Sequence, residues 1–383
     1  MNISNYKKCI ILGGGIAGCT AAHLLHKYAP NLQITMYEAT DTLSGLCVPN
    51  KDVKNLSYYP GKYGCHTFHT DNDAVHELFK ELYPDCVKYT QCTEVKIKDH
   101  YYPWPINLDT LDGLVNEYIP DMFTRETVLD EFYSDTKFNT NLYVNVSSLP
   151  SKLRELVIAV LIIPYTELQW GILSDSYVCS VVADRVKVYL DRNKATFRNA
   201  FEYIPKTMDY STILTTMYED NVVVKFNETV TYADLKPSSS TLIINTTPID
   251  EFYGIKGALP YRTLEFEETI RTDLQDRAIT INYSGKDISD TTRIHNHSTH
   301  VFKEKPKQYE AKSGELPMYP SIKLTDDTYQ QIIGRKTLER KTTMDSMWYV
   351  DDNIIHLGRL GTYQYLDIDK VILQVKCAID NIV

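Results

Sequence analysis

The sequence lacks the features that mark membrane, secreted and nucleic-acid-binding proteins. No apolar run reaches the roughly 18 residues that a membrane-spanning helix needs. Residues 1–8 lead directly into an apolar stretch and leave no room for a signal peptide, so we expect a cytoplasmic protein. Basic residues are fewer than acidic ones, 40 against 50, and the net charge is −10. We therefore expect neither nucleic acid nor a membrane as a partner.

Cysteine pairs, repeats and low-complexity segments are also missing. The eight cysteines are scattered and form no C-x-x-C pair, which is typical of reduced thiols and not of disulfides or zinc ligands. The 383 residues are enough for two or three domains. Tyrosine is frequent, at 29 residues, which reflects either a biased composition or aromatic hydroxyls that line a polar cleft.

The most informative stretch is an apolar segment, residues 10–12, that runs into glycines with the spacing G-x-G-x-x-G. In this pattern Gly13 allows a tight turn, Gly15 lets the backbone approach a pyrophosphate, and Gly18 lets a helix pack close to the strand. Residues 19–25 continue as that helix. The N-terminus of the helix offers N–H groups and a positive dipole end to phosphates.

A second predicted strand, residues 32–37, ends in Glu38, about twenty residues after the glycines. An acid at this position accepts hydrogen bonds from a ribose diol. The strands, the glycines, the helix and the acid together predict a dinucleotide site. The alternative is a glycine-rich turn in an unrelated α/β domain.

Residues 63–70, Tyr-Gly-Cys-His-Thr-Phe-His-Thr, follow about 50 residues after the glycine loop. This stretch resembles the UDP-galactopyranose mutase family of flavoenzymes. Further segments are similar to the same family and extend the resemblance over nearly the whole chain: 103–108, 165–171, 259–266, 281–283, 292–294, 317–320 and 356–369.

The resemblance implies an α/β fold in which a FAD-binding Rossmann-like domain carries an inserted helical domain and an antiparallel β-sheet domain for the substrate. The expected boundaries are 1–85 with 218–255 and 340–383 for the FAD-binding domain, 108–178 for the helical domain, and 86–107 with 179–217 and 256–339 for the sheet domain. Exposed helical surface in the inserted domain would suit a homodimer.

The resemblance implies a flavin-dependent isomerase. It would interconvert UDP-galactopyranose and UDP-galactofuranose, or a related nucleotide sugar, through a covalent flavin N5–sugar adduct that needs reduced FAD. Two alternatives stay open. One is a FAD-binding homologue without mutase activity, and the other is a FAD-dependent oxidoreductase on the same scaffold.

The resemblance also assigns site residues. The expected catalytic residues are His66, Arg293, Tyr365 and Asp367. The cofactor would lie against Gly13, Gly15, Ile16, Ala17, Gly18, Glu38, Gly45, Leu46, His66, Arg359 and Asp367. The UDP-sugar would contact Tyr165, Trp170, Tyr189, Arg262, Asn282, Arg293, Tyr319 and Tyr365. The alternative interpretation of Trp170 is an aromatic residue of the hydrophobic core. His66 and His69 are three residues apart, but no third ligand is in view, and we expect no metal.

The chain departs from the family pattern at Leu168, where the family has lysine, at Asn296, where it has glutamate, and at Tyr189. Tyr189 aligns with an arginine that lies on a mobile loop, which begins at Trp170, and pairs with the substrate diphosphate. Arginine offers a charged fork and tyrosine a single neutral hydrogen bond.

Nearby cations that could replace the missing charge are Arg185, Lys187 and Arg192. Without such a replacement we expect a slow mutase that Tyr189→Arg accelerates. The rival interpretation is a pocket reshaped for a different nucleotide sugar, in which Tyr189 is a fitted contact.

Overall fold

The computed structural model describes residues 1–51, 61–134, 142–171, 186–206, 210, 221–235, 238–284, 290–297, 299–321, 323–344 and 346–383. The chain forms two compact units. The first contains Met1–Tyr89, Asn199–Thr263 and Gln308–Val383, and the second contains Thr90–Arg198 and Leu264–Lys307. Among the described helices, none is long and apolar enough to cross a membrane.

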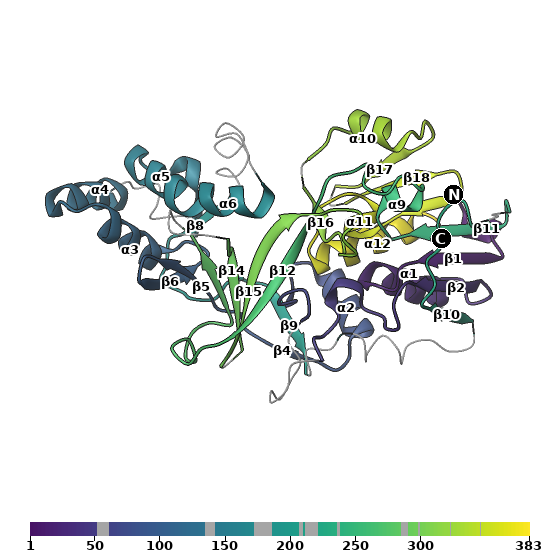
Figure 1. The fold of residues 1–383 in the computed structure, drawn as a ribbon, viewed down its shortest axis with the longest axis horizontal. Coiled ribbons are helices and arrows are strands. Elements are labelled where there is room, and N and C mark those ends of the chain that lie inside the picture. Colours follow the sequence, from purple (N-terminus) through teal and green to yellow (C-terminus); the bar gives the residue numbers. More distant parts are fainter. Residues whose placement is uncertain are drawn as a thin grey trace. The chain divides into compact units, whose positions relative to one another are not determined.

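The first unit is built on a seven-stranded sheet (Figure 1). Its strands, in spatial order, are β10 (Val222–Phe226), β2 (Gln33–Glu38), β1 (Lys8–Leu12), β11 (Thr241–Asn245), β19 (Ile354–His356), β18 (Met347–Asp351) and β17 (Glu339–Thr342). The first five strands are parallel, and the last two add an antiparallel edge. The central strand β11 is buried along its whole length, because helices cover both faces of such a sheet.

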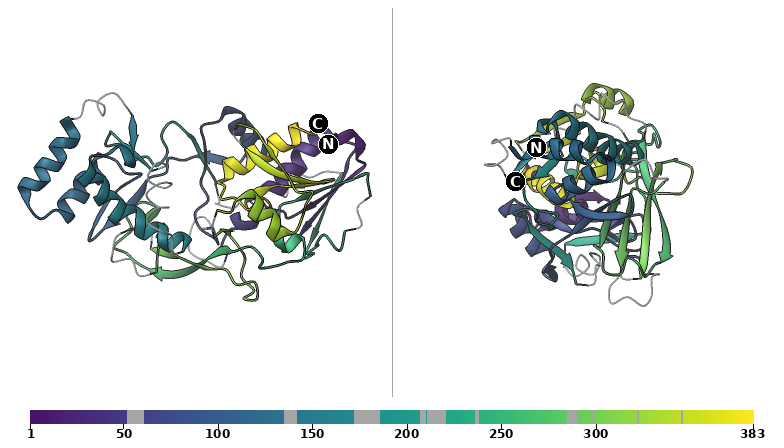
Figure 2. Two further views of the ribbon diagram at one scale, coloured as in Figure 1. Left: turned by 90° about the horizontal axis from the view of Figure 1, so that it is seen from above. Right: turned by 90° about the vertical axis from the view of Figure 1, so that its left-hand side faces the viewer.

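Helix α1 (Ile16–Tyr28) packs against α12 (Ile368–Asp380) in this unit. Ala21 and Ala22 are fully buried, and their small side chains allow the close approach of α1. The two ends of the chain lie side by side (Figure 2), because the N–H of Ile3 donates to the carbonyl of Ile382 at 2.7 Å. The structure therefore confirms the predicted strands β1 and β2 and the predicted helices α1 and α12 of the dinucleotide fold.

Smaller elements complete the first unit. A three-stranded sheet has the order β3 (Phe68–Thr70), β9 (Phe201–Pro205) and β4 (Cys86–Lys88). The helices are α2 (Asp73–Leu82), α9 (Ile249–Phe252), α10 (Asp326–Ile333) and α11 (Gly358–Gly361). Strand β16 (Tyr319–Pro320) pairs with the first residues of β12 (Tyr261–Ile270), which continues into the second unit.

The second unit joins a sheet to a group of helices. Its other strands are β15 (His300–Gln308), β14 (Arg293–His297), β13 (Thr280–Tyr283), β5 (Thr93–Ile97), β6 (His100–Trp104), and the separate pair β7 (Tyr143–Asn145) and β8 (Lys187–Tyr189). The helices are α3 (Leu108–Tyr118), α4 (Met122–Ser134), α5 (Ser151–Val157) and α6 (Ile163–Trp170), with a π-helical turn at Ile158–Ile162.

The helices and the sheet of the second unit share one hydrophobic core. Val95 and Ile97 of β5 belong to the same buried cluster as Leu111 and Leu114 of α3. A second, smaller cluster belongs to the sheet domain alone and consists of Leu274, Ile281, Ile294 and Val301. The helical and sheet domains that we expected as separate bodies lie within one compact unit, because the larger core joins them. The FAD-binding domain that we expected also takes up residues 308–339.

Candidate functional site

The glycine turn at the end of β1 has the geometry that its spacing predicts. Gly13 has a φ of +94°, and a Cβ there would lie 2.4 Å from the hydroxyl of Thr246. A Cβ on Gly18 would lie 1.9 Å from the carbonyl oxygen of Gly13. The positive φ at Gly13 strains any other residue, and a Cβ on Gly18 would clash with backbone, so Gly18 lets α1 pack close to β1.

The N-terminus of α1 faces the segment that contains Ser44 and Gly45. Ser44 has a φ of 112° and forms a parallel bridge with Gly15. A Cβ on Gly15 would meet only ordinary contacts, the nearest at 3.7 Å from Gly45. In the described chain no side chain caps α1. Its first N–H groups can therefore serve an anionic ligand.

Glu38 ties the end of β2 to the glycine turn. Its carboxylate accepts hydrogen bonds from the N–H of Gly14 at 2.8 Å and from the N–H and hydroxyl of Thr40 at 2.9 and 2.7 Å. The side chain is buried. These bonds fix the carboxylate beside the turn, where the sequence predicts a ribose contact.

A second turn, at the start of α11, lies against α1. Gly358 has a φ of +78°, and a Cβ there would come within 3.0 Å of the Cβ of Ala17. The next residue, Arg359, donates from Nε and Nη2 to the carbonyl of Leu366 at 3.0 and 2.6 Å. Its guanidinium lies 4.7 Å from the ring centre of Tyr365. The Leu366 carbonyl and the Tyr365 ring thus hold the guanidinium of Arg359, and its contact with a pyrophosphate stays a prediction.

The predicted substrate residues of the first unit gather around Tyr365. Its ring is 47% exposed and meets the buried ring of Tyr319 edge-on at 5.6 Å. Tyr319 pairs across the strands with Arg262, which is also buried. Three residues from distant parts of the sequence therefore come together in one place.

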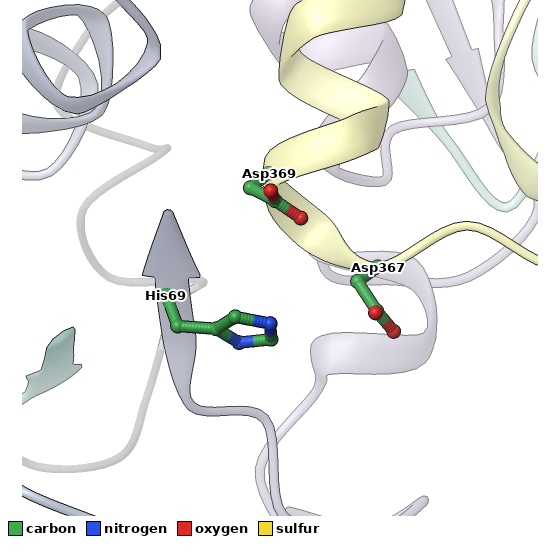
Figure 3. A group of neighbouring side chains, drawn as sticks. All are labelled: His69, Asp367 and Asp369. Carbon is green, nitrogen blue, oxygen red and sulfur yellow. The ribbon is translucent and has the colours of Figure 1, made fainter. Parts of the chain in front are cut away.

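Figure 3 shows His69 on β3 pointing toward Asp367 and Asp369 at the start of α12. One ligand atom from each residue lies within 4.8 Å of the others. Asp367 is the N-cap residue of α12 and is exposed, whereas Asp369 is buried. Burial raises the pKa of the Asp369 carboxyl, and the neighbouring Asp367 raises it further, against the opposing effects of Lys370 and His69.

Two carboxylates and an imidazole are a donor set that divalent cations accept. Two observations weigh against a cation at His69, Asp367 and Asp369. The cluster lies at the N-terminus of α12, where the positive dipole end favours an anion. Lys370 also places its ammonium 3.4 Å from Asp369. We keep the prediction that the protein binds no metal.

His66 lies in the segment between β3 and the glycine at position 64. It is half-buried, and its carbonyl accepts a hydrogen bond of 2.8 Å from the hydroxyl of Tyr210. Tyr210 is itself buried. A buried phenol therefore fixes the backbone that carries the predicted catalytic histidine.

In the second unit, Arg293 brings together three predicted substrate residues. Its guanidinium donates to the hydroxyl of Tyr165, which comes from α6. Asn282 pairs with Arg293 across β13 and β14 and is buried. A cation, a hydroxyl and an amide thus come together at two inner strands of the sheet. These are groups that can bind a phosphate or a sugar hydroxyl.

A buried carboxylate lies behind Arg293. Glu304 on β15 stands directly opposite Arg293 in the strand register, with Oε1 3.8 Å from the arginine Nε. Its other oxygen lies 2.9 Å from Nε2 of His295. The Glu304 side chain is only 4% exposed. Sequence analysis missed Glu304, because its position beside Arg293 depends on the pairing of β14 with β15.

Trp170 and Tyr189 lie at the edges of the expected mobile loop. Trp170 is half-buried at the last residue of α6. Tyr189 belongs to β8 and not to a loop, and it is 9% exposed. The guanidinium of Arg198 covers its ring at 4.6 Å. The loop expectation is therefore corrected at Tyr189, because the pairing of β8 with β7 fixes this residue in a sheet.

The proposed replacements for the missing charge have other partners. Arg192 is paired with Asp109 and Asp112 on α3. The ammonium of Lys187 lies 4.3 Å from the ring centre of Tyr143. Arg185 lies outside the described residues.

Asn296, where the family has glutamate, has a structural role. Its side-chain amide donates to the carbonyls of Leu274, Arg277 and Ala278 at 2.6, 3.3 and 3.4 Å. It therefore anchors the segment that connects β12 to β13.

Comparisons with known proteins place the chain in a family. A family model described as UDP-galactopyranose mutase matches residues 160–365, and one described as an NAD(P)-binding Rossmann-like domain matches residues 11–82. The chain is 24% identical over 388 residues to a dTDP-fucopyranose mutase from Escherichia coli, with 97% of each chain covered. It is 25% identical over 381 residues to a probable UDP-galactopyranose mutase from Klebsiella pneumoniae, covering 97% of this chain and 93% of the relative.

A solved structure of a reduced UDP-galactopyranose mutase has the same fold, with a TM-score of 0.59 and 17% identity over 98% of this chain and 95% of that one. The predicted Rossmann-like domain within an α/β fold is confirmed by both the family models and this structure.

Proposed function

Because the chain belongs to the UDP-galactopyranose mutase family, we propose that it is a FAD-dependent isomerase that interconverts the pyranose and furanose forms of a nucleotide sugar. UDP-galactose is the substrate that the family name suggests. The dTDP-fucopyranose mutase relative adds a dTDP-linked sugar as the second compound to test.

The observation that carries this proposal is the group around Arg293. Tyr165 reaches Arg293 from α6, far away in the sequence, and Asn282 stands opposite it in the strand register. The family resemblance assigns all three residues to the substrate. The guanidinium side chain is 29% exposed, so a ligand can reach it. A charged fork of this kind suits a diphosphate.

The first unit fits FAD. Gly13 and Gly18 bring α1 close to β1, and a Cβ on Gly15 would meet nothing nearer than 3.7 Å. The uncapped N-terminus of α1 would supply N–H donors to a pyrophosphate. Glu38 would hold the ribose and Arg359 would neutralise phosphate charge. The N-terminus of α12, with Asp367 at its cap, would lie against the flavin.

Reduced FAD, when bound, supplies the nucleophile for a reaction without net oxidation. The protein has to bind the departing diphosphate, and Arg293 is the group placed for this role, because charge on the leaving group grows in the transition state. Tyr365 and Tyr319 offer hydroxyls, and Arg262 adds a cation, in the first unit. Asp367 is an exposed carboxylate that can accept a hydrogen bond from a sugar hydroxyl.

A FAD-binding homologue without mutase activity is the second candidate. The observation that favours it is Tyr189, which stands where the family has an arginine for the diphosphate. The tyrosine is buried beside Arg198 and offers no charge of its own.

The experiment is a turnover assay with protein reduced by dithionite under anaerobic conditions. UDP-galactofuranose and dTDP-fucofuranose are incubated separately with the protein, and formation of the pyranose is followed by chromatography. We expect conversion of at least one substrate. FAD-loaded, reduced protein that converts neither would favour the second candidate.

A further inference from the structure

A chain of three buried polar side chains and one half-buried tyrosine runs through the first unit and ends at the glycine turn. It consists of Asp351, Tyr253, His356 and Asn245, and we call it the buried polar chain. The Tyr253 hydroxyl lies 2.7 Å from Oδ2 of Asp351 and 3.0 Å from Nε2 of His356. Nδ1 of His356 lies 3.2 Å from the side-chain amide nitrogen of Asn245.

The direction of every hydrogen bond in this chain follows from chemistry. Ionised Asp351 only accepts, so the single proton of the Tyr253 hydroxyl goes to it. Tyr253 must then accept from His356, which places the imidazole proton on Nε2. Nδ1 is left as an acceptor and receives an N–H from Asn245.

The charges along the chain agree with these directions. Burial raises the pKa of Asp351, but hydrogen bonds from Thr337, Tyr253 and Arg335 outweigh it and hold the pKa below its ordinary value. Burial lowers the pKa of His356 to about 3, so the imidazole is neutral at physiological pH. Asp351, His356 and Asn245 are each completely buried.

Asn245 connects the buried polar chain to the turn that follows β11 by hydrogen bonds. Its oxygen accepts from the N–H and the hydroxyl of Thr247 at 3.1 and 2.6 Å, and its amide donates to the Thr247 carbonyl at 3.2 Å. The preceding residue, Thr246, donates from its hydroxyl to the carbonyl of Leu12 at 2.7 Å. The Thr246 hydroxyl is also the atom that a Cβ on Gly13 would strike.

We propose that Tyr253 and His356 are positioning residues for the dinucleotide site. They act through Asn245 on the Thr246–Thr247 turn, and this turn sets the position of Gly13 and hence the phosphate-binding backbone. The proposal rests on the proposed function, because it assumes that the glycine turn binds FAD. Neither residue contacts the cofactor in this account.

The test measures the dissociation constant of FAD for apoprotein by quenching of flavin fluorescence. Tyr253→Phe removes one oxygen and breaks the chain, and His356→Phe breaks it at the imidazole. We expect either variant to weaken FAD binding roughly threefold to thirtyfold, the range over which coupled residues that do not contact a ligand alter its binding. His356→Gln offers a donor and an acceptor at similar positions and should restore most of the affinity.

Tyr349→Phe is the matched control. Tyr349 is buried on β18 directly opposite His356 in the strand register, and its hydroxyl donates to a carboxylate of Asp326 at 3.2 Å. Tyr349→Phe therefore removes a buried hydroxyl next to His356 without removing a hydrogen bond of the buried polar chain. It should lower the melting temperature as Tyr253→Phe does, with no change in FAD affinity. If His356→Phe fails to fold, Tyr253→Phe alone carries the comparison.

The outcomes separate this inference from the proposed function. A wild-type protein that binds FAD, with Tyr253→Phe and Tyr349→Phe binding it equally well, would overturn the positioning role alone. A wild-type protein that binds no FAD would overturn the proposed function and this inference with it.

Discussion

Acidification should destabilise the first unit through His356. The imidazole is fully buried, and burial lowers its pKa from the ordinary 6.5 to about 3. As the pH falls below 6.5, His356 becomes protonated in the unfolded chain but stays neutral in the folded chain. The unfolded state then binds more protons, so the free energy of unfolding falls with falling pH between 6.5 and about 3.

The magnitude follows from the width of this window. Each pH unit below 6.5 removes about 1.4 kcal/mol, so the loss at pH 5 is about 2 kcal/mol. His297 in the second unit has a pKa that burial likewise lowers to about 3, and it acts in the same direction. A variant that lacks His356 but keeps His297 isolates the part of the loss in unfolding free energy that comes from His356.

The assay is urea denaturation at pH 7 and pH 5, followed by circular dichroism, for wild type and His356→Gln. Glutamine does not titrate in this range and can retain both hydrogen bonds. We expect the wild type to lose about 2 kcal/mol more than the variant on acidification. Equal losses would refute the assignment of His356 as a neutral, buried member of the polar chain.

Other predictions concern the candidate site. Arg293→Ala should weaken UDP binding more than tenfold and leave FAD bound, since truncating one partner of a buried charge-assisted contact costs about 2–5 kcal/mol. Titration with UDP should show no such loss of affinity for Arg277→Ala. From sequence alone Tyr189→Arg should accelerate turnover. The structure reverses this expectation, because Tyr189→Arg would bury a second guanidinium beside Arg198. We expect the variant to lose about 1–3 kcal/mol in the free energy of unfolding and to show no gain in rate. A faster variant would contradict this expectation. Prolonged dialysis against EDTA should leave turnover unchanged, and loss of activity restored by a divalent cation would reopen the metal question.

Local signals predicted the dinucleotide fold well. The glycine spacing, the acid after β2 and the start of α12 near Asp367 depend on residues close together in the sequence, so their geometry could be read from it. The division into domains could not be predicted from the sequence, because it depends on which helices share a hydrophobic core with which strands.

Contacts that depend on strand register were beyond the sequence. Glu304 stands opposite Arg293 only because β14 and β15 pair as they do. Asp351 and His356 were invisible as a functional group for the same reason, since the antiparallel edge of the sheet brings them to Tyr253. The alignment of Tyr189 with a loop arginine does not reveal its burial beneath Arg198, which changes the expected effect of a substitution there.

The redox balance of turnover tests the central proposal most directly. The bound flavin is reduced with one equivalent of dithionite under anaerobic conditions, excess furanose substrate is added, and the product is counted per flavin while the absorbance spectrum is recorded. The account predicts many product molecules per flavin, with the flavin still reduced at the end. One product per flavin with reoxidation of the cofactor, or no product from fully reduced protein, would contradict it.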